Sequence, residues 1–361
     1  MPQLAPIGSV SATPISPAAS PEVPKWPAAF SKAGPIRSGP TGTLSDPCVL
    51  RVSGVWHMWY SRTRGKIQSI EHMTSLRAED GWLAMATEIV LSGSAGSDPT
   101  GRSQHWETPS VLVLPDARVL LLALRWPGPC PAGLGRMDSI VEFLGDSPSG
   151  PFVYQGVART AEYPWEGYYS QDVEGQMRLR GGPMEPALFT YGTEVRALYA
   201  GQSVWYGDSG SSSPGAWGFR VGLMKRVGAG LWQGVSAKPV IPRGAAGSWD
   251  SQIVSHVHAT PHPVAGTLIA YAGGSGSTPS GLGLAWTGDG GVTVVKYPGN
   301  PILTRGSGTG GWDSVEIGGP SILWDAESKL WVLHYHGGLS GDFSQMQIGV
   351  ANASAGTVPI F

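Results

Sequence analysis

Charged side chains, cysteine and long apolar runs are all scarce in this chain of 361 residues. Only 14% of the residues are Asp, Glu, Lys or Arg and the net charge is −2, so the chain lacks the basic footprint of a nucleic-acid-binding protein. No apolar run approaches the roughly 20 residues that a membrane-spanning helix needs. The two cysteines, Cys48 and Cys130, are too few for a disulfide framework; they either form one bridge or stay as buried thiols.

Glycine, proline and tryptophan are abundant instead, with 53, 31 and 15 residues. This composition is typical of many short strands joined by tight turns and argues against helical bundles. Residues 1–30 form a Pro/Ser/Ala-rich arm without the charged and apolar regions of a signal peptide. The arm is a linker, part of a trimmed secreted precursor, or a segment lying on the surface. We expect residues 31–361 to form a single domain.

Five segments repeat the same core of strand, turn and second strand, and a glycine-bearing third strand follows several of them. They are residues 33–62, 106–126, 184–201, 237–274 and 298–337. Copies at regular intervals along the chain, each with three or four short strands, are the signature of propeller blades. The sequence therefore predicts an all-β, five-bladed β-propeller with a central channel. A two-sheet sandwich is the alternative.

The innermost strand of each propeller blade lines the channel, so the first residues of these strands converge on one pocket. The five predicted entrances are Asp46-Pro47, Glu107-Thr108-Pro109, Glu185-Pro186, His256-Val257-His258 and Gly319-Pro320. Three of them carry an acid in a chain with little charge. This alignment makes Asp46, Glu107 and Glu185 the candidate catalytic residues.

Four short motifs resemble those of the five-bladed propeller glycoside hydrolases, the clan of families 43 and 32. They are "SDPCVL" (45–50), "WETPSVL" (106–112), "MEPALF" (184–189) and "GDSPSGPFVYQGV" (145–157). The resemblance covers residues 40–353 and is strongest for family 43. Two departures stand out: family 43 usually has Asp at the second-blade position, and "MEPALF" lacks the Gly that family 43 places between Glu and Pro.

The resemblance implies a role for each acid. Asp46 would be the general base of a family 43-like mechanism or the nucleophile of a family 32-like one. Glu185 would be the general acid, and Glu107 a third acid that tunes the pKa of Glu185 and holds sugar hydroxyls. In the family 32 pattern, Glu107 and Glu185 exchange roles. Cleavage of a glycosidic bond normally requires one carboxylic acid and one carboxylate, which such a set supplies.

Histidines and aromatic residues near the entrances are candidate substrate-binding groups. His256 and His258 lie on one face of their strand, where they orient a substrate hydroxyl, bind a structural ion, or serve only the fold. The loop and strand candidates for the pocket rim are Trp165, Tyr168, Trp205 and Arg220. Taken singly, packing within a blade is the simpler explanation of each aromatic residue, and an exposed strand end is the alternative for Arg220. Glu316 near the last entrance is a weaker candidate. Asp250 and Asp313, both in Trp-Asp-Ser, indicate a repeated turn in which the side chain accepts backbone N–H groups.

The histidine pairs lack a third clustered ligand, so no metal is predicted at the catalytic site and no cofactor is required. A structural Ca²⁺ or other ion in the channel remains open.

The leading hypothesis is a glycoside hydrolase acting on an oligo- or polysaccharide, with a furanoside such as an arabinan-type glycan as substrate and inversion at the anomeric carbon. We expect it outside the cell or at its surface, with the oligomeric state open. Two alternatives are a non-catalytic glycan-binding propeller of a surface or virion-associated assembly, and a phosphorylase, which would need a basic cluster beside the acids.

Overall fold

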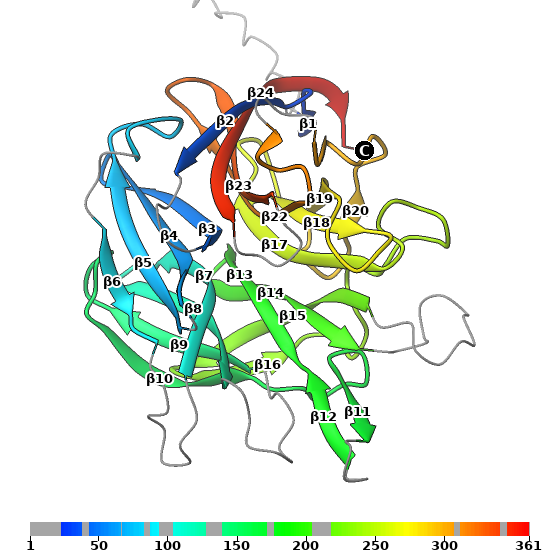
Figure 1. Cartoon of the computed structure of the whole chain (residues 1–361). Coiled ribbons are helices and arrows are strands. Elements are labelled where there is room, and N and C mark those ends of the chain that lie inside the picture. The colour runs from blue at the N-terminus through cyan, green and yellow to red at the C-terminus, as the bar shows by residue number, and fades with distance from the viewer. Residues whose placement is uncertain are drawn as a thin grey trace, which may run out of the picture.

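The computed structural model describes residues 23–37, 43–65, 67–82, 87–93, 104–127, 139–171, 177–203, 218–306, 311–339 and 345–360. Five antiparallel sheets of four or five strands form a ring, and the chain follows the ring in sequence order (Figure 1). The fold is a five-bladed β-propeller, as the repeats predict. No helix in the part of the chain that the model describes is long and apolar enough to cross a membrane.

The first strand of each sheet is the innermost strand of its blade. Blade 1 consists of β3 (Thr43–Val52), β4 (Val55–Arg64), β5 (Ile67–Ser75) and β6 (Glu88–Leu91). Blade 2 consists of β7 (Gln104–Val113), β8 (Val119–Pro127), β9 (Ser139–Gly145) and β10 (Phe152–Arg159). Blade 3 consists of β13 (Pro183–Tyr191), β14 (Glu194–Ser203), β15 (Gly218–Gly228) and β16 (Leu231–Gly234). The short hairpin of β11 (Gly167–Gln171) and β12 (Met177–Gly181) precedes it.

Blade 4 consists of β17 (Ile253–Pro261), β18 (Thr267–Gly274), β19 (Gly281–Thr287), β20 (Val295–Lys296) and β21 (Leu303–Thr304). Blade 5 combines β22 (Glu316–Asp325), β23 (Leu330–Gly338) and β24 (Met346–Pro359) with β1 (Lys25–Pro27) and β2 (Ser31–Arg37), both of which pair with β24. The two ends of the chain thus share one sheet. The predicted division at residue 30 runs between two strands of that sheet, so the arm contributes to the domain from residue 25.

In blades 3, 4 and 5, a glycine of the third strand makes room for a tryptophan from the loop beside the blade. A Cβ atom on Gly222 would lie 2.2 Å from Trp165 Cη2 and 2.9 Å from Tyr199 Cζ, distances that real Cβ atoms essentially never show. Gly283 and Trp249 repeat the arrangement in blade 4, as do Gly349 and Trp312 in blade 5. Each tryptophan packs on a tyrosine of the middle strand, with ring centroids 5.1 to 5.7 Å apart. Close packing, which tolerates no added methyl group here, explains why glycine recurs.

The acid that follows each of these tryptophans binds the same tyrosine and a cation. Asp250 accepts bonds from Tyr271 (3.2 Å) and Lys296 (2.6 Å), and Asp313 accepts bonds from Tyr335 and Lys32. Glu166 does the same with Tyr199 and Arg159. The predicted turn role of Asp250 and Asp313 is therefore wrong: these acids anchor side chains within a blade, because a buried carboxylate needs charged or hydroxyl partners.

Candidate active site

Each inner strand begins with a β-bulge, in which two residues oppose one residue of the neighbouring strand. The first residue of each bulge has a positive φ, between 46° and 54°. These five entrance residues are Asp46, Thr108, Glu185, His256 and Gly319. Four of them are not glycine, and non-glycine residues held in this region mark places where strain serves a function.

The five bulges surround one pocket at the end of the central channel. Its lining consists of Asp46, Pro47, Thr108, Pro109, Ser110, Glu185, Pro186, His256, Val257, His258, Gly319 and Pro320. All five blades contribute to it. The pocket therefore brings together the predicted catalytic residues Asp46 and Glu185 and the predicted binding residues His256 and His258.

The bulge register corrects the sequence alignment in blade 2. Glu107 pairs with Leu124 just before the bulge, and Thr108 occupies the position that Asp46 and Glu185 hold in their blades. The proline sets this register because it follows the entrance residue directly in four blades. Glu107 is half-buried and does not line the pocket, although its charge acts on His256. Its alignment with the other two acids is wrong, and its role as a third acid stays a prediction.

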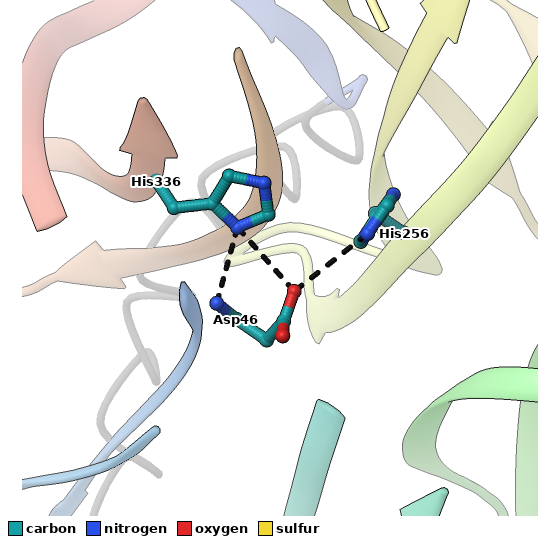
Figure 2. Close-up of side chains that lie close together, drawn as sticks. All are labelled: Asp46, His256 and His336. Atoms are coloured by element: carbon teal, nitrogen blue, oxygen red, sulfur yellow. Dashed lines mark hydrogen bonds and ion pairs between the residues drawn. The ribbon is translucent and has the colours of Figure 1, made fainter. Parts of the chain in front are cut away.

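Asp46 is held as a carboxylate. Its Oδ2 accepts a bond from Ser45 Oγ (2.8 Å), its Oδ1 lies 3.3 Å from His336 Nδ1 and 3.6 Å from His256 Nε2, and its backbone N–H donates to His336 Nδ1 (3.1 Å; Figure 2). Burial raises its pKa, but His336 and His256 outweigh burial and lower the pKa to about 2. The group is thus ionised at neutral pH and suited to accept a proton.

The pKa of Glu185 is shifted in the opposite direction to that of Asp46. Its Oε2 accepts the backbone N–H of His256 (2.6 Å), and its Oε1 lies 3.2 Å from His256 Nε2. Burial raises its pKa and the Asp46 carboxylate adds to this effect, while the ring and the N–H of His256 oppose it; the net shift is upward. Two carboxyl groups in one pocket with pKa values moved apart are suited to act as an acid and a base.

Two further residues at the site were missed or undervalued by the sequence. His336 lies on β23, the second strand of blade 5, where an entrance motif gives no signal for it; its ring is T-shaped to that of His256 at 5.4 Å (Figure 2). Glu316, at the start of β22, is 3% exposed, and burial raises its pKa. Its charge acts on both His336 and His256.

His258 belongs to a ring of bonds between blades that lies below the pocket. Its Nδ1 accepts the N–H of Ile322 in blade 5 (3.2 Å), and burial lowers its pKa to about 4, so the imidazole is neutral. Cys48, Ser110 and Ser321 accept a backbone N–H of a neighbouring blade in the same way. This ring fixes the inner strands relative to one another. Cys48 is a free, buried thiol, and Cys130 lies outside the described residues.

Of the remaining predicted binding residues, the two whose side chains are described, Trp165 and Arg220, do not line the pocket. Trp165 is 1% exposed and packed inside blade 3, so its predicted place at the rim is wrong, because Gly222 and Tyr199 enclose the ring. Arg220 is fully buried on β15 and donates to the carbonyl groups of residues 203 and 218. Tyr168 lies on β11, but its side chain, like the whole of Trp205, lies outside the described residues.

Asp46, His256 and His336 offer three possible ligand atoms within 4.8 Å of one another. The Nδ1 lone pair of His336 already accepts the N–H of Asp46, which leaves one carboxylate and one imidazole to hold an ion. Calcium prefers six to eight oxygen ligands, which these residues do not supply. The set fits an ion-pair network better than a cation site.

No family model matches the sequence, and no curated protein matches it. Solved structures do. A thermostable family-43 glycoside hydrolase aligns over 90% of this chain and 96% of its own, with 12% identity and a TM-score of 0.59. The alpha-L-arabinofuranosidase from Lactobacillus brevis aligns over 90% and 98%, with 10% identity and a TM-score of 0.59. A family 117 glycoside hydrolase from Zobellia galactanivorans aligns over 90% of each chain, with 13% identity and a TM-score of 0.57. The fold is that of the propeller glycoside hydrolases.

Proposed function

We propose that this protein hydrolyses glycosidic bonds in an oligo- or polysaccharide, outside the cell or at its surface. One observation carries the proposal: blades 1 and 3 bring Asp46 and Glu185 into one pocket, and the pKa of Asp46 is lowered to about 2 while that of Glu185 is raised. A reaction that needs a carboxylate and a carboxylic acid on either side of one bond matches this pair.

In the proposed mechanism, the Glu185 carboxylic acid gives its proton to the departing glycosidic oxygen. The Asp46 carboxylate takes a proton from a water molecule, which attacks the anomeric carbon from the opposite side and inverts it. The bond to the leaving oxygen breaks as the bond to water forms, so each step conserves protons. The carboxyl groups exchange protons with solvent before the next cycle. Glu107 assists by its charge, as its coulombic effect on His256 suggests.

The substrate class is proposed to be a furanoside of the arabinan type. The motifs that resemble family 43 and the similarity in fold to an alpha-L-arabinofuranosidase support it. Phosphorolysis is less well supported, because none of the described residues that line the pocket is the Lys or Arg that usually binds phosphate.

A panel of aryl furanosides, aryl pyranosides and plant polysaccharides, read out by released aglycone or reducing ends, tests the proposal. Asp46→Asn and Glu185→Gln should each lower kcat/KM about 10²–10⁴-fold on a responding substrate. Asp116→Asn, in an exposed turn, is the matched control and should retain full activity. Proton NMR of the first-formed anomer decides between inversion and retention.

Two outcomes would overturn the assignment. If both variants hydrolyse the substrate as fast as the wild type, these residues are not the acid and the base. If the wild type binds a glycan of the panel and releases no product from any, the protein is a glycan-binding propeller and not a hydrolase.

A further inference from the structure

His256 is the one titratable entrance residue besides the two proposed catalytic carboxyl groups. Blade 2 offers Thr108 at the equivalent position and blade 5 offers Gly319, neither of which carries a charge. The pocket therefore lacks an entrance acid in blade 2, where the sequence alignment places one, and has an imidazole in blade 4. His256 lies beside both carboxyl groups and so affects the pKa of each.

Both the backbone and the side chain of His256 contact Glu185. The positive φ of 46° turns its N–H to Glu185 Oε2 (2.6 Å), and its Nε2 lies 3.2 Å from Glu185 Oε1 and 3.6 Å from Asp46 Oδ1. Ser255 Oγ, 3.0 Å from Nδ1, fixes the far side of the ring. The ring thus spans the gap between the two carboxyl groups in a single orientation.

We propose that His256 is a positioning residue that holds Glu185 for proton donation and links it to Asp46. This inference rests on the proposed hydrolase function. The groups whose charges act on His256 from the surrounding strands are Glu185, Asp46, Glu316 and Glu107, and His336 contacts its ring edge. Burial lowers the pKa of His256, but the four carboxyl groups outweigh burial, so the net shift of this pKa is upward. Four carboxyl groups beside one neighbouring imidazole thus favour a positive charge on His256.

The direction of the effect follows from this charge. A cation beside a carboxyl group lowers the pKa of that group, and His256 does so for both Asp46 and Glu185. Loss of the imidazole therefore raises both pKa values. In a bell-shaped pH profile of kcat/KM, the acid limb reports the base and the basic limb reports the acid. Both limbs should move to higher pH.

The test compares His256→Gln and His256→Asn with wild type on a substrate from the panel. Asn tolerates positive φ, and Gln has an amide that reaches toward Glu185. Both limbs should rise by about one pH unit, as expected when an opposite charge within about 4 Å of each carboxyl group is removed. Gln, which restores the contact, should lose less kcat than Asn, and KM should change less than about threefold because the contact acts on the reacting group and not on the bound sugar. His57→Gln, which removes a half-buried imidazole from β4 of blade 1, should leave both limbs in place. Limbs that stay fixed in both His256 variants would overturn the proposal.

A second measurement separates this proposal from the hydrolase function. NMR titration of the His256 ring in wild type and in Glu185→Gln reads the contact without any substrate. The pKa of His256 should fall by about one unit in the variant, because a carboxyl group that raises it has been removed. An unchanged His256 titration would refute the positioning role even if hydrolysis is found. If no substrate is hydrolysed but the His256 titration shifts, the contact between His256 and Glu185 is supported and only the proposed hydrolase function is refuted.

Discussion

Replacing His336 with Gln should shift the acid limb of the pH profile more than the basic limb, because His336 acts mainly on Asp46 and only weakly on Glu185. His336 is 1% exposed, accepts the N–H of Asp46 and lies 3.3 Å from its Oδ1. The pKa of Asp46 falls from 3.8 to about 2, although burial acts to raise it, and His336 provides the largest opposing contribution. A glutamine amide can accept the same N–H but removes the imidazole whose interaction with the carboxylate lowers the pKa of Asp46.

The magnitude follows from these values. Full return of Asp46 to its ordinary pKa would be a shift of about 2 units, which corresponds to about 2.5 kcal/mol of interaction. Because burial still raises this pKa in the variant while His256 and Ser45 still lower it, the acid limb of kcat/KM should rise by up to about 2 units. The same shift predicts a stability difference. A carboxyl group with a lowered pKa stabilises the fold above its unfolded pKa near 4 and loses this contribution as pH falls toward 2. Wild type should therefore exceed the variant by up to about 2.5 kcal/mol at pH 7, and the difference should shrink as the pH falls from 4 to 2.

Activity between pH 2 and 8, together with urea unfolding over the same range, checks both parts. His334→Gln is the matched control: it lies two residues earlier on β23, is equally buried and bonds the carbonyl of Ala78, and burial lowers its pKa to about 4, so it is neutral. It should lower stability without moving the acid limb. An acid limb of His336→Gln that coincides with wild type, or a stability difference that does not depend on pH, would refute the reasoning.

Three further substitutions test the fold around the site. Gly222→Ala should lower the free energy of unfolding by about 1–3 kcal/mol or more, because the new methyl group meets the ring of Trp165; thermal unfolding measures it, and an unchanged melting temperature would contradict the packing argument. Ser110→Ala leaves a buried backbone N–H of blade 3 without its side-chain acceptor and should cost about 1–3 kcal/mol in urea unfolding; a loss below the error of the method would show that the ring of bonds contributes nothing. Lys32→Met should cost about 3–5 kcal/mol by leaving Asp313 unpaired in the interior, and amide exchange in β2 should rise with it; unchanged exchange would show that the ion pair does not hold this strand.

The fold was within reach of the sequence because the pattern repeats. Each predicted core of strand, turn and strand became the two innermost strands of a blade, and Asp46-Pro47 and Glu185-Pro186 lie at the predicted entrances. Hydrophobic periodicity and turn residues are local properties, and five copies reinforce one another. The pairing of β1 with β24 had no such signal, since the two strands come from opposite ends of the chain.

The site was only half predictable. In Glu107-Thr108-Pro109, the acid was aligned with the acids of the other entrances. The bulge instead follows the proline, so an alignment of the prolines would have placed Thr108 at the entrance. His336 reaches the pocket from a middle strand because the entrance of blade 5 is glycine: a Cβ on Gly319 would lie 2.5 Å from His336 Nδ1. Such a contact depends on the absence of a side chain on the neighbouring strand and cannot be recognised from the residues that flank His336 in the sequence.

The shared sheet of blade 5 gives the molecule a seam where its first and last segments meet. The contact between Asp46 and His336 crosses the boundary between blade 1 and blade 5, so the proposed base is tuned by a residue that leaves the ribosome only after the other four blades have been made. A partly synthesised chain can form the early blades but holds Asp46 without its principal partner. The full lowering of the Asp46 pKa therefore requires the closed ring of blades, and an opening between blades 1 and 5 would raise this pKa while the other blades are still folded.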